Sequence, residues 1–314
     1  MRVGAIFPGQ GSQTVGMGVD AARAYPAAAE CFGVAKMILG YDLLSVCEHG
    51  PAEKLTETRY AQPAIFVANV ALARAVGDAL DPVASAGHSF AEFCSLTMAG
   101  ALTFESALVL VNERGLAMQR AAGLANGAMS AVLGLAPDAL RTAVAQAARS
   151  GAGRVQLANF NAPGQIVISG DADAVRVAGE FALEAGAKRV VPLNVSGAWH
   201  SVLMEPAQRE FAPHVTAATV MLPRFTVISN VEAKPYTDIE QIKTNLIRSV
   251  TDEVLWHGTA VALVGLGLDL IVEFGASPVL APMFKRIEGA PKAITVSDAA
   301  GVGKLREQLA QAVA

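Results

Sequence analysis

Residues 84–93 read Ala84-Ser85-Ala86-Gly87-His88-Ser89-Phe90-Ala91-Glu92-Phe93, and they indicate a strand, a turn and a helix. An apolar run ending near Ala86 is typical of a buried strand, and the run from Phe90 to Met98 is typical of a helix. Ser89 falls at the sharp turn between them, which is the geometry of a nucleophile elbow. Such a turn exposes the serine hydroxyl and puts the backbone N–H of Phe90 at a helix N-terminus, where it can stabilise an oxyanion.

The elbow differs from the common pattern G-x-S-x-G at its last position, because the chain reads Gly87-His88-Ser89-Phe90-Ala91. Glycine is favoured there because the strand and helix backbones approach closely, and alanine is the smallest replacement. Short serine motifs also recur by chance. On this stretch alone, a surface serine in a strand–helix turn stays open as the alternative.

Composition and charge narrow the class of protein. The chain has 314 residues, of which 53% are hydrophobic and 17% charged, as expected for an enzyme with a large core in one or two domains. A net charge of -4 without a long basic run argues against a nucleic-acid partner. Cys31, Cys47 and Cys94 lack metal-ligand spacing, so we expect a reducing compartment, no disulfide, no metal and no cofactor.

The N-terminus and the apolar runs predict the location. The chain leads from Met1 directly into the strand-like run Val3–Phe7, with no signal-peptide pattern. The aliphatic stretch 259–272 is broken by Gly265 and Gly267, so it predicts a helix, a turn and a buried strand rather than a membrane span. We therefore expect a cytoplasmic protein without a membrane partner.

The order of the elements predicts the architecture. Helices and strands alternate along most of the chain, which favours an α/β fold with a mostly parallel sheet. Residues 126–192 instead follow the order β-α-β-β-α-β, which is that of a ferredoxin-like unit. We predict an α/β-hydrolase-like large subdomain from residues 1–125 and 193–314, which carries the serine, and a small ferredoxin-like subdomain inserted at 126–192.

The glycine-rich loop Pro8-Gly9-Gln10-Gly11-Ser12-Gln13 has two interpretations. It is superficially similar to a dinucleotide-binding fingerprint, but Thr14 stands where the third glycine belongs. The alternative is that the loop brings the backbone N–H of Gln10 beside the elbow. Two-donor oxyanion holes are commonly built from such an early loop and the residue after the nucleophile.

A reactive serine needs a base, and histidine titrates in the useful range. His88 precedes Ser89 and should point away from its hydroxyl, while His49, His214 and His257 show no site pattern. His200 follows a strand end and a glycine turn, where the active sites of open α/β sheets collect. It is therefore the candidate base, with a purely structural histidine as the alternative.

Arg114 is a candidate for anion binding. It lies in a helix expected from about residue 104 to 122, among apolar neighbours. A fixed guanidinium suits a substrate carboxylate because it can donate two parallel hydrogen bonds. The alternative is an arginine that snorkels to solvent or pairs with a carboxylate such as Glu113.

Motifs along the whole chain together resemble one family. They are Phe7-Pro8-Gly9-Gln10-Gly11-Ser12-Gln13, Gln62-Pro63-Ala64, Gly87-His88-Ser89, Arg114-Gly115-x-x-Met118-Gln119, Asn159-x-Asn161-x-Pro163-Gly164-Gln165, Ser196-Gly197-Ala198-Trp199-His200-Ser201, Ser229-Asn230-Val231 and Glu273-Phe274-Gly275. Their order and spacing resemble malonyl-CoA:acyl-carrier-protein transacylases, including the free-standing acyltransferases that serve polyketide synthases.

The resemblance implies a role for each matching residue. Ser89 is the nucleophile, His200 its base, Gln10 and Phe90 the oxyanion donors, and Arg114 the ligand of the malonyl carboxylate; Asn159 and Trp199 are implied substrate-binding residues. The implied reaction is ping-pong transfer of malonyl from malonyl-CoA to the phosphopantetheine thiol of an acyl carrier protein, in fatty acid or polyketide biosynthesis.

Three departures from the family pattern bear on these roles. Phe90 and Ala91 replace the usual leucine and glycine of the elbow. Trp199 stands where phenylalanine or serine is commoner, so its bulk should narrow the acyl pocket. Ser249 takes the place of a glutamine whose backbone carbonyl orients the histidine, and a backbone acceptor survives a change of side chain.

Carrier proteins are generally acidic and this chain is net acidic too, so docking should use a local basic patch. We expect Lys188, Arg189, Lys285 and Arg286 to form it, unless they are simply a solvated face. Other functions stay open: an acyl hydrolase acting on carrier proteins, a transacylase for another acyl group, or a catalytically weak docking subunit. Arg114 argues against the hydrolase, and the intact set of site residues argues against the docking subunit.

Overall fold

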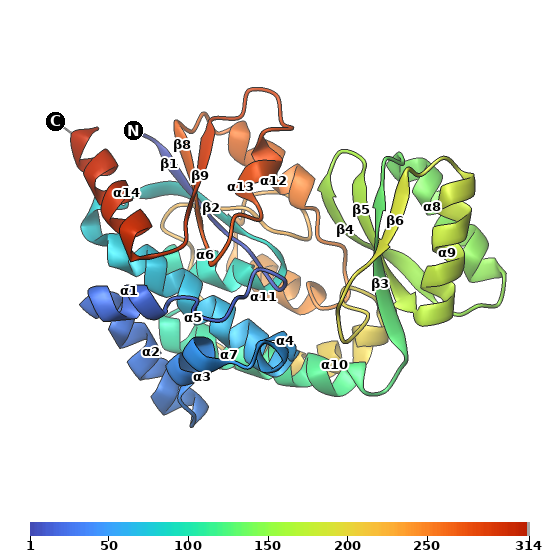
Figure 1. Cartoon of the computed structure of the whole chain (residues 1–314), viewed down its shortest axis with the longest axis horizontal. Helices are drawn as coiled ribbons and strands as arrows, with labels where there is room; N and C mark the ends of the chain where they lie inside the picture. Colours follow the sequence, from blue (N-terminus) through green and yellow to red (C-terminus); the bar gives the residue numbers. More distant parts are fainter. Residues whose placement is uncertain (313–314) are drawn as a thin grey trace.

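A computed structural model describes residues 1–312, so the last two residues of the predicted segment 193–314 lie outside it. Two sheets lie side by side, each with its own helices (Figure 1). The chain thus has a mixed α/β fold. Within the described residues, no helix combines the length and the apolarity that a membrane crossing requires.

The larger sheet is parallel throughout, as the alternation of elements predicted. Its strands are β7 (Thr226–Val227), β2 (Pro82–Gly87), β1 (Val3–Phe7), β8 (Leu270–Phe274) and β9 (Lys292–Val296), in that order. All five residues of β1 are buried, because both faces of the sheet are covered. Side chains alternate between the faces: Val3, Ala5 and Phe7 join one apolar core and Ile6 joins the other.

Helices surround this sheet. They are α1 (Val19–Ala24), α2 (Pro26–Leu39), α3 (Leu43–His49), α4 (Ala52–Thr56), α5 (Thr58–Val76), α6 (Glu92–Met98), α7 (Phe104–Ala122), α10 (Glu205–Ala217), α11 (Ile239–Arg248), α12 (Trp256–Val264), α13 (Ala281–Phe284) and α14 (Ala299–Gln311). Pro63 lies inside α5, which begins five residues earlier at Thr58. The N–H groups of Tyr60 and Ala61 already bond to Glu57 O at 2.9 and 2.8 Å, which starts the helix before the proline.

The smaller sheet is antiparallel and has its own core. Its elements are β3 (Gly127–Leu133), α8 (Pro137–Arg149), β4 (Val155–Ala162), β5 (Gln165–Asp171), α9 (Ala172–Glu184) and β6 (Arg189–Pro192), and the strand order is β4-β5-β3-β6. Leu140, Leu157 and Ile168 are among the residues buried between this sheet and its helices. Hydrogen bonds from Phe160 N to Val254 O and from Val254 N to Ala158 O, both 2.8 Å, join β4 to the segment after α11.

The register of β1 and β2 positions the site. Phe7 pairs with Gly87, and His88 N donates to Phe7 O at 2.9 Å, so both strands end at the same level of the sheet. The glycine-rich loop and the serine turn therefore leave the sheet side by side. This is the carboxyl edge of a parallel sheet, where ligands of open α/β folds usually bind.

Candidate active site

Ser89 lies at a tight strand-to-helix turn. It opens a short 3-10 turn, Ser89–Ala91, between β2 and α6, and its φ of 55° is in the left-handed region. A Cβ on Gly87 would lie 2.0 Å from Ala91 O, so only glycine fits at that position. The close approach that the sequence placed at Ala91 is thus satisfied by Gly87, and Ala91 itself is accommodated in the core.

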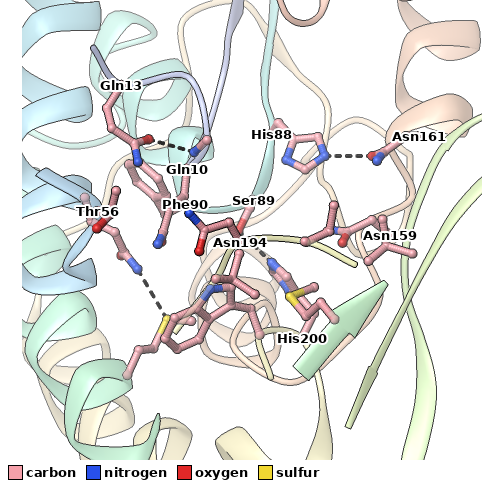
Figure 2. A pocket seen from close by; sticks show the side chains of 18 of the residues that line it. Gln10, Gln13, Thr56, His88, Ser89, Phe90, Asn159, Asn161, Asn194 and His200 are labelled. Atoms are coloured by element: carbon pink, nitrogen blue, oxygen red, sulfur yellow. Dashed lines mark hydrogen bonds between the residues drawn. The ribbon is translucent and has the colours of Figure 1, made fainter. Parts of the chain in front are cut away.

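The Ser89 hydroxyl meets an imidazole. Ser89 Oγ lies 2.8 Å from His200 Nε2, across 111 residues of sequence (Figure 2). His200 also has left-handed backbone, with φ 57°, and both residues are buried. Burial, followed by the charges of Arg114 and His88, lowers the pKa of His200 to about 3. The imidazole is therefore neutral near pH 7 and is free to accept a proton.

The second ring nitrogen of His200 is held by backbone, but not at the predicted residue. Nδ1 lies 3.1 Å from Asp252 O, whereas the Ser249 carbonyl accepts from Arg114 Nη2 at 3.3 Å. The backbone carbonyls of Asp252 and Ser249 both raise the pKa of His200, and the effect of Asp252 is the larger. The chain turns after α11, where Asp252 N bonds to Arg248 O at 2.8 Å, and this turn carries the Asp252 carbonyl to the ring.

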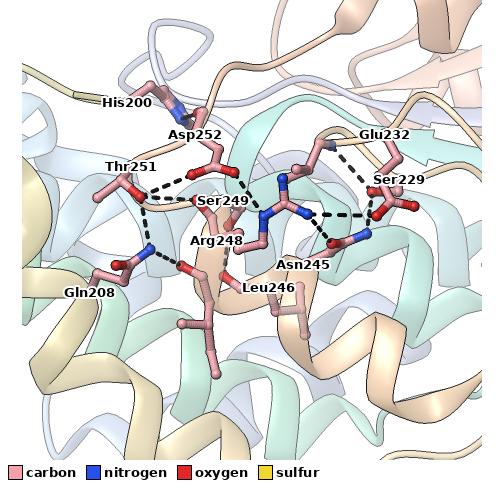
Figure 3. A network of polar contacts seen from close by, with 12 residues as sticks. His200, Gln208, Ser229, Glu232, Asn245, Leu246, Arg248, Ser249, Thr251 and Asp252 are labelled. Atoms are coloured by element: carbon pink, nitrogen blue, oxygen red, sulfur yellow. Dashed lines mark hydrogen bonds and ion pairs between the residues drawn. The ribbon is translucent and has the colours of Figure 1, made fainter. Parts of the chain in front are cut away.

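Side chains brace that turn from both sides (Figure 3). Arg248 Nε donates to Asp252 Oδ2 at 2.8 Å, and Gln208 Nε2 donates to Thr251 Oγ1 at 2.8 Å. Gln156, on β4, donates at 3.2 Å to both His200 O and Thr251 O. The histidine and its acceptor are thus tied to the smaller sheet and to α10 and α11, by residues that carry no catalytic signature in the sequence.

One pocket collects most of the predicted site. Its volume is about 190 Å³, and its lining includes Gln10, Ser89, Phe90, Arg114, Asn159, Trp199 and His200 (Figure 2). Ser249 is not part of the lining. Thr56, Leu193 and Asn194 are exposed lining residues, so they mark the side of the pocket that faces solvent.

Backbone N–H groups point to an oxyanion site. Within residues 1–312, the N–H groups of Gln10 and Phe90 donate to no protein acceptor, whereas that of Ser89 donates to Asn230 Oδ1 at 3.1 Å. A Cβ on Gly9 would lie 2.6 Å from His88 O, so the glycine-rich loop packs directly against the elbow. This arrangement favours the oxyanion interpretation of the loop over the dinucleotide one.

Arg114 is a buried cation with spare hydrogen-bond donors. It is 1% exposed, and its Nη1 donates to Gln62 Oε1 at 3.0 Å. Its Nε has no partner among the described residues. Glu113, the suggested partner, lies instead 3.8 Å from His214. Burial lowers the pKa of Arg114 to about 9, with Glu92 opposing the shift, so the guanidinium stays charged at neutral pH.

His88 points away from the Ser89 hydroxyl, as expected. Its Nε2 lies 2.9 Å from Asn161 Oδ1, and its ring centroid is 5.7 Å from that of Trp256. Asn161 and Gln62 both line the pocket but were not singled out as site residues. Each lies within a family motif, Gln62-Pro63-Ala64 or Asn159-x-Asn161, and that was the only signal available for them.

The four predicted docking residues lie outside the pocket and are exposed. Arg189 pairs with Leu133, Leu133 pairs with Gln165, and Arg286 Nη1 donates to Gln165 Oε1 at 3.5 Å. Neighbouring residues on β6, β3 and β5 thus link Arg189 to Arg286 across one end of the smaller sheet. Lys285 and Arg286 follow α13 rather than lying within it, because that helix ends at Phe284.

A parallel sheet with a buried serine–histidine pair at its carboxyl edge is the arrangement of an acyl-transferring enzyme. The chain belongs to the acyl transferase domain family, which matches residues 5–313. It is 40% identical over 307 residues to the malonyl CoA-acyl carrier protein transacylase of Haemophilus influenzae, covering 97% of this chain and 98% of that one.

Solved structures agree with this family. An acyl carrier protein S-malonyltransferase from Vibrio cholerae superposes with a TM-score of 0.91 at 39% identity, covering 97% of this chain and all 100% of that one. A malonyl-transacylase solved in complex with its type II polyketide synthase acyl-carrier protein gives a TM-score of 0.93 at 36% identity, with 98% and 100% covered.

Proposed function

We propose that this protein transfers a malonyl group from malonyl-CoA to the phosphopantetheine thiol of an acyl carrier protein. His200 Nε2 takes the proton of Ser89 as Oγ attacks the thioester carbonyl. The tetrahedral intermediate collapses, the C–S bond breaks, and the proton passes to the departing CoA thiolate. The carrier thiol then gives its proton to His200 and attacks the malonyl-serine ester. The C–O bond to Ser89 Oγ breaks, and His200 returns the proton to that oxygen, which restores the Ser89 hydroxyl.

The remaining residues stabilise charge in this scheme. The N–H groups of Gln10 and Phe90 hold the oxyanion of each tetrahedral intermediate. Arg114 binds the malonyl carboxylate, Trp199 limits the size of the acyl group, and Asn159 contacts the substrate. The observation that carries the proposal is the buried guanidinium of Arg114, which lines the same pocket as the Ser89–His200 pair. A hydrolase for neutral acyl groups has no use for that cation.

The proposal extends to architecture and context. We infer an α/β-hydrolase-like large subdomain from residues 1–125 and 193–314, with a ferredoxin-like subdomain inserted at 126–192. Support comes from the element order β3-α8-β4-β5-α9-β6 and from the separate core of that segment. The acidic carrier protein docks at Lys188, Arg189, Lys285 and Arg286. The substrates are those of cytoplasmic fatty acid or polyketide biosynthesis.

Intact mass spectrometry tests the function directly. The protein is incubated with malonyl-, methylmalonyl- or acetyl-CoA, and we expect a malonyl adduct that disappears when a phosphopantetheinylated carrier protein is added. Ser89→Ala should form no adduct, and His200→Ala should load about 10⁴-fold more slowly, at the upper end of what a general base contributes. A Ser89→Ala protein that still gains a malonyl mass would contradict the assignment.

A further inference from the structure

The motif Ser229-Asn230-Val231 has no task in the proposed chemistry, yet Asn230 lies directly behind the elbow. It is 1% exposed and follows β7, the strand beside β2. Its Oδ1 accepts the Ser89 N–H at 3.1 Å, and its Nδ2 donates to Gly87 O at 2.7 Å and to Ser89 O at 3.3 Å. One side-chain amide thus binds both ends of the serine turn.

Glu92 fixes which way that amide faces. The Glu92 carboxylate, 2% exposed, accepts from Asn230 N at 2.9 Å and also from Asn230 Nδ2, while its other oxygen accepts from Tyr236 Oη. If the amide turned over, Oδ1 would face the carboxylate and two carbonyls, and Nδ2 would face an N–H. All of these contacts would be repulsive, so the carboxylate selects the orientation that holds Ser89.

The amide compensates for an unfavourable backbone. A non-glycine residue in the left-handed region persists only where its surroundings enforce it, and Ser89 has φ 55°. The hydrogen bonds from Asn230 supply that constraint on both sides of the Ser89 peptide. They also occupy the Ser89 N–H, whereas the N–H of Phe90 donates to no acceptor within residues 1–312 and can face an acyl oxygen.

We propose that Asn230, oriented by Glu92, is a positioning residue that holds Ser89 in its left-handed conformation, with the hydroxyl against His200 and the Phe90 N–H toward the acyl carbonyl. One of the two readouts, the kinetics of malonyl loading, rests on the proposed function. The other is the rate at which a fluorophosphonate probe phosphonylates Ser89, and this rate can be measured whatever the natural acyl substrate is.

The test compares Asn230→Ala and Asn230→Leu with a matched control, Asn245→Ala. Asn245 is also 1% exposed; its Nδ2 donates to Ser229 Oγ at 3.1 Å and its Oδ1 accepts from Arg248 Nη1 at 3.4 Å (Figure 3). Within residues 1–312, no hydrogen bond joins its side chain to the elbow or to His200. Melting temperature, probe labelling rate, and kcat and KM for malonyl loading are measured on each. The control loses a buried amide of the same kind without touching Ser89.

We expect Asn230→Ala to lower both the labelling rate and kcat about 100-fold, the cost typical of a misplaced reacting group, with KM for malonyl-CoA unchanged. Asn245→Ala should lose melting temperature but keep both rates. Asn230→Leu keeps about the same volume but lacks both the donors and the acceptor, so it should be as slow as Asn230→Ala.

Two results would overturn the inference. One is that Asn230→Ala and Asn245→Ala lose activity equally, in step with their melting temperatures. The other is that Asn230→Leu labels at the wild-type rate, which would make Asn230 a space-filling residue. If the wild type reacts with the probe but never loads malonyl, the proposed function fails, while the labelling rates still decide the role of Asn230.

Discussion

Replacing Arg114 by alanine should change which acyl group the protein accepts. The guanidinium is 1% exposed and is held at two nitrogens, by Gln62 Oε1 at 3.0 Å and Ser249 O at 3.3 Å. A malonyl carboxylate in this pocket would be buried, and removing the partner of a buried charge costs about 3–5 kcal/mol. At about tenfold per 1.4 kcal/mol, kcat/KM for malonyl-CoA should fall roughly 100- to 4,000-fold.

Loading of acetyl-CoA provides the internal control. It should be unchanged or faster in Arg114→Ala, because a neutral acyl group gains nothing from the guanidinium, and this shows that the variant is folded. Arg120→Ala, on the same helix but exposed and paired with Glu210, should leave both substrates unaffected. The assay is single-turnover loading with each CoA ester. An Arg114→Ala enzyme that keeps its preference for malonyl over acetyl would refute the carboxylate-binding role.

The pKa of Arg114 adds a pH test in the wild type. Because burial lowers that pKa to about 9, the free enzyme loses the cation as pH rises through about 9 and keeps it below. kcat/KM reports the free enzyme, so its value for malonyl-CoA should fall above pH 9 relative to that for acetyl-CoA. A constant ratio of the two values from pH 7 to 10 would show that the guanidinium keeps its proton over this range.

Two further predictions concern size and docking. Trp199→Ala should raise the ratio of kcat/KM for methylmalonyl-CoA to kcat/KM for malonyl-CoA about tenfold, which is within the range that one methyl group contributes in a pocket. An unchanged ratio would mean that Trp199 does not limit the size of the acyl group. Reversing the charges of Lys188, Arg189, Lys285 and Arg286 together should raise KM for the carrier protein, most at low salt, and leave malonyl-CoA loading nearly intact; unchanged carrier kinetics would exclude this patch.

The parts of the site that the sequence predicted are those with a local pattern. The strand, sharp turn and helix around Ser89 follow from a few adjacent residues, and the parallel sheet follows from the alternation of elements. His200 lies 111 residues from Ser89, and it was selected by its glycine turn and by excluding the other histidines. In the structure, Ser89 Oγ lies 2.8 Å from His200 Nε2, in agreement with the predicted nucleophile and base.

Contacts through backbone atoms or across distant segments were not predictable in this way. The acceptor of His200 is the Asp252 carbonyl, and every residue carries a carbonyl, so only the course of the turn after α11 decides which one reaches the ring. Asn230 reaches Ser89 across 141 residues, and Gln156 reaches His200 from the other sheet. Nothing in a polar residue's own neighbourhood reveals such a partner.

Three non-glycine residues in the described part of the chain have left-handed backbone, and two of them are Ser89 and His200. Selection for thermal stability alone would favour glycine at both positions, since glycine adopts this conformation without steric cost. A screen of random mutants for heat resistance should therefore select glycine at Ser89 and His200, where any replacement removes a reacting group. Stability and turnover oppose each other here at single residues, so an engineer who needs both must seek the gain elsewhere in the fold.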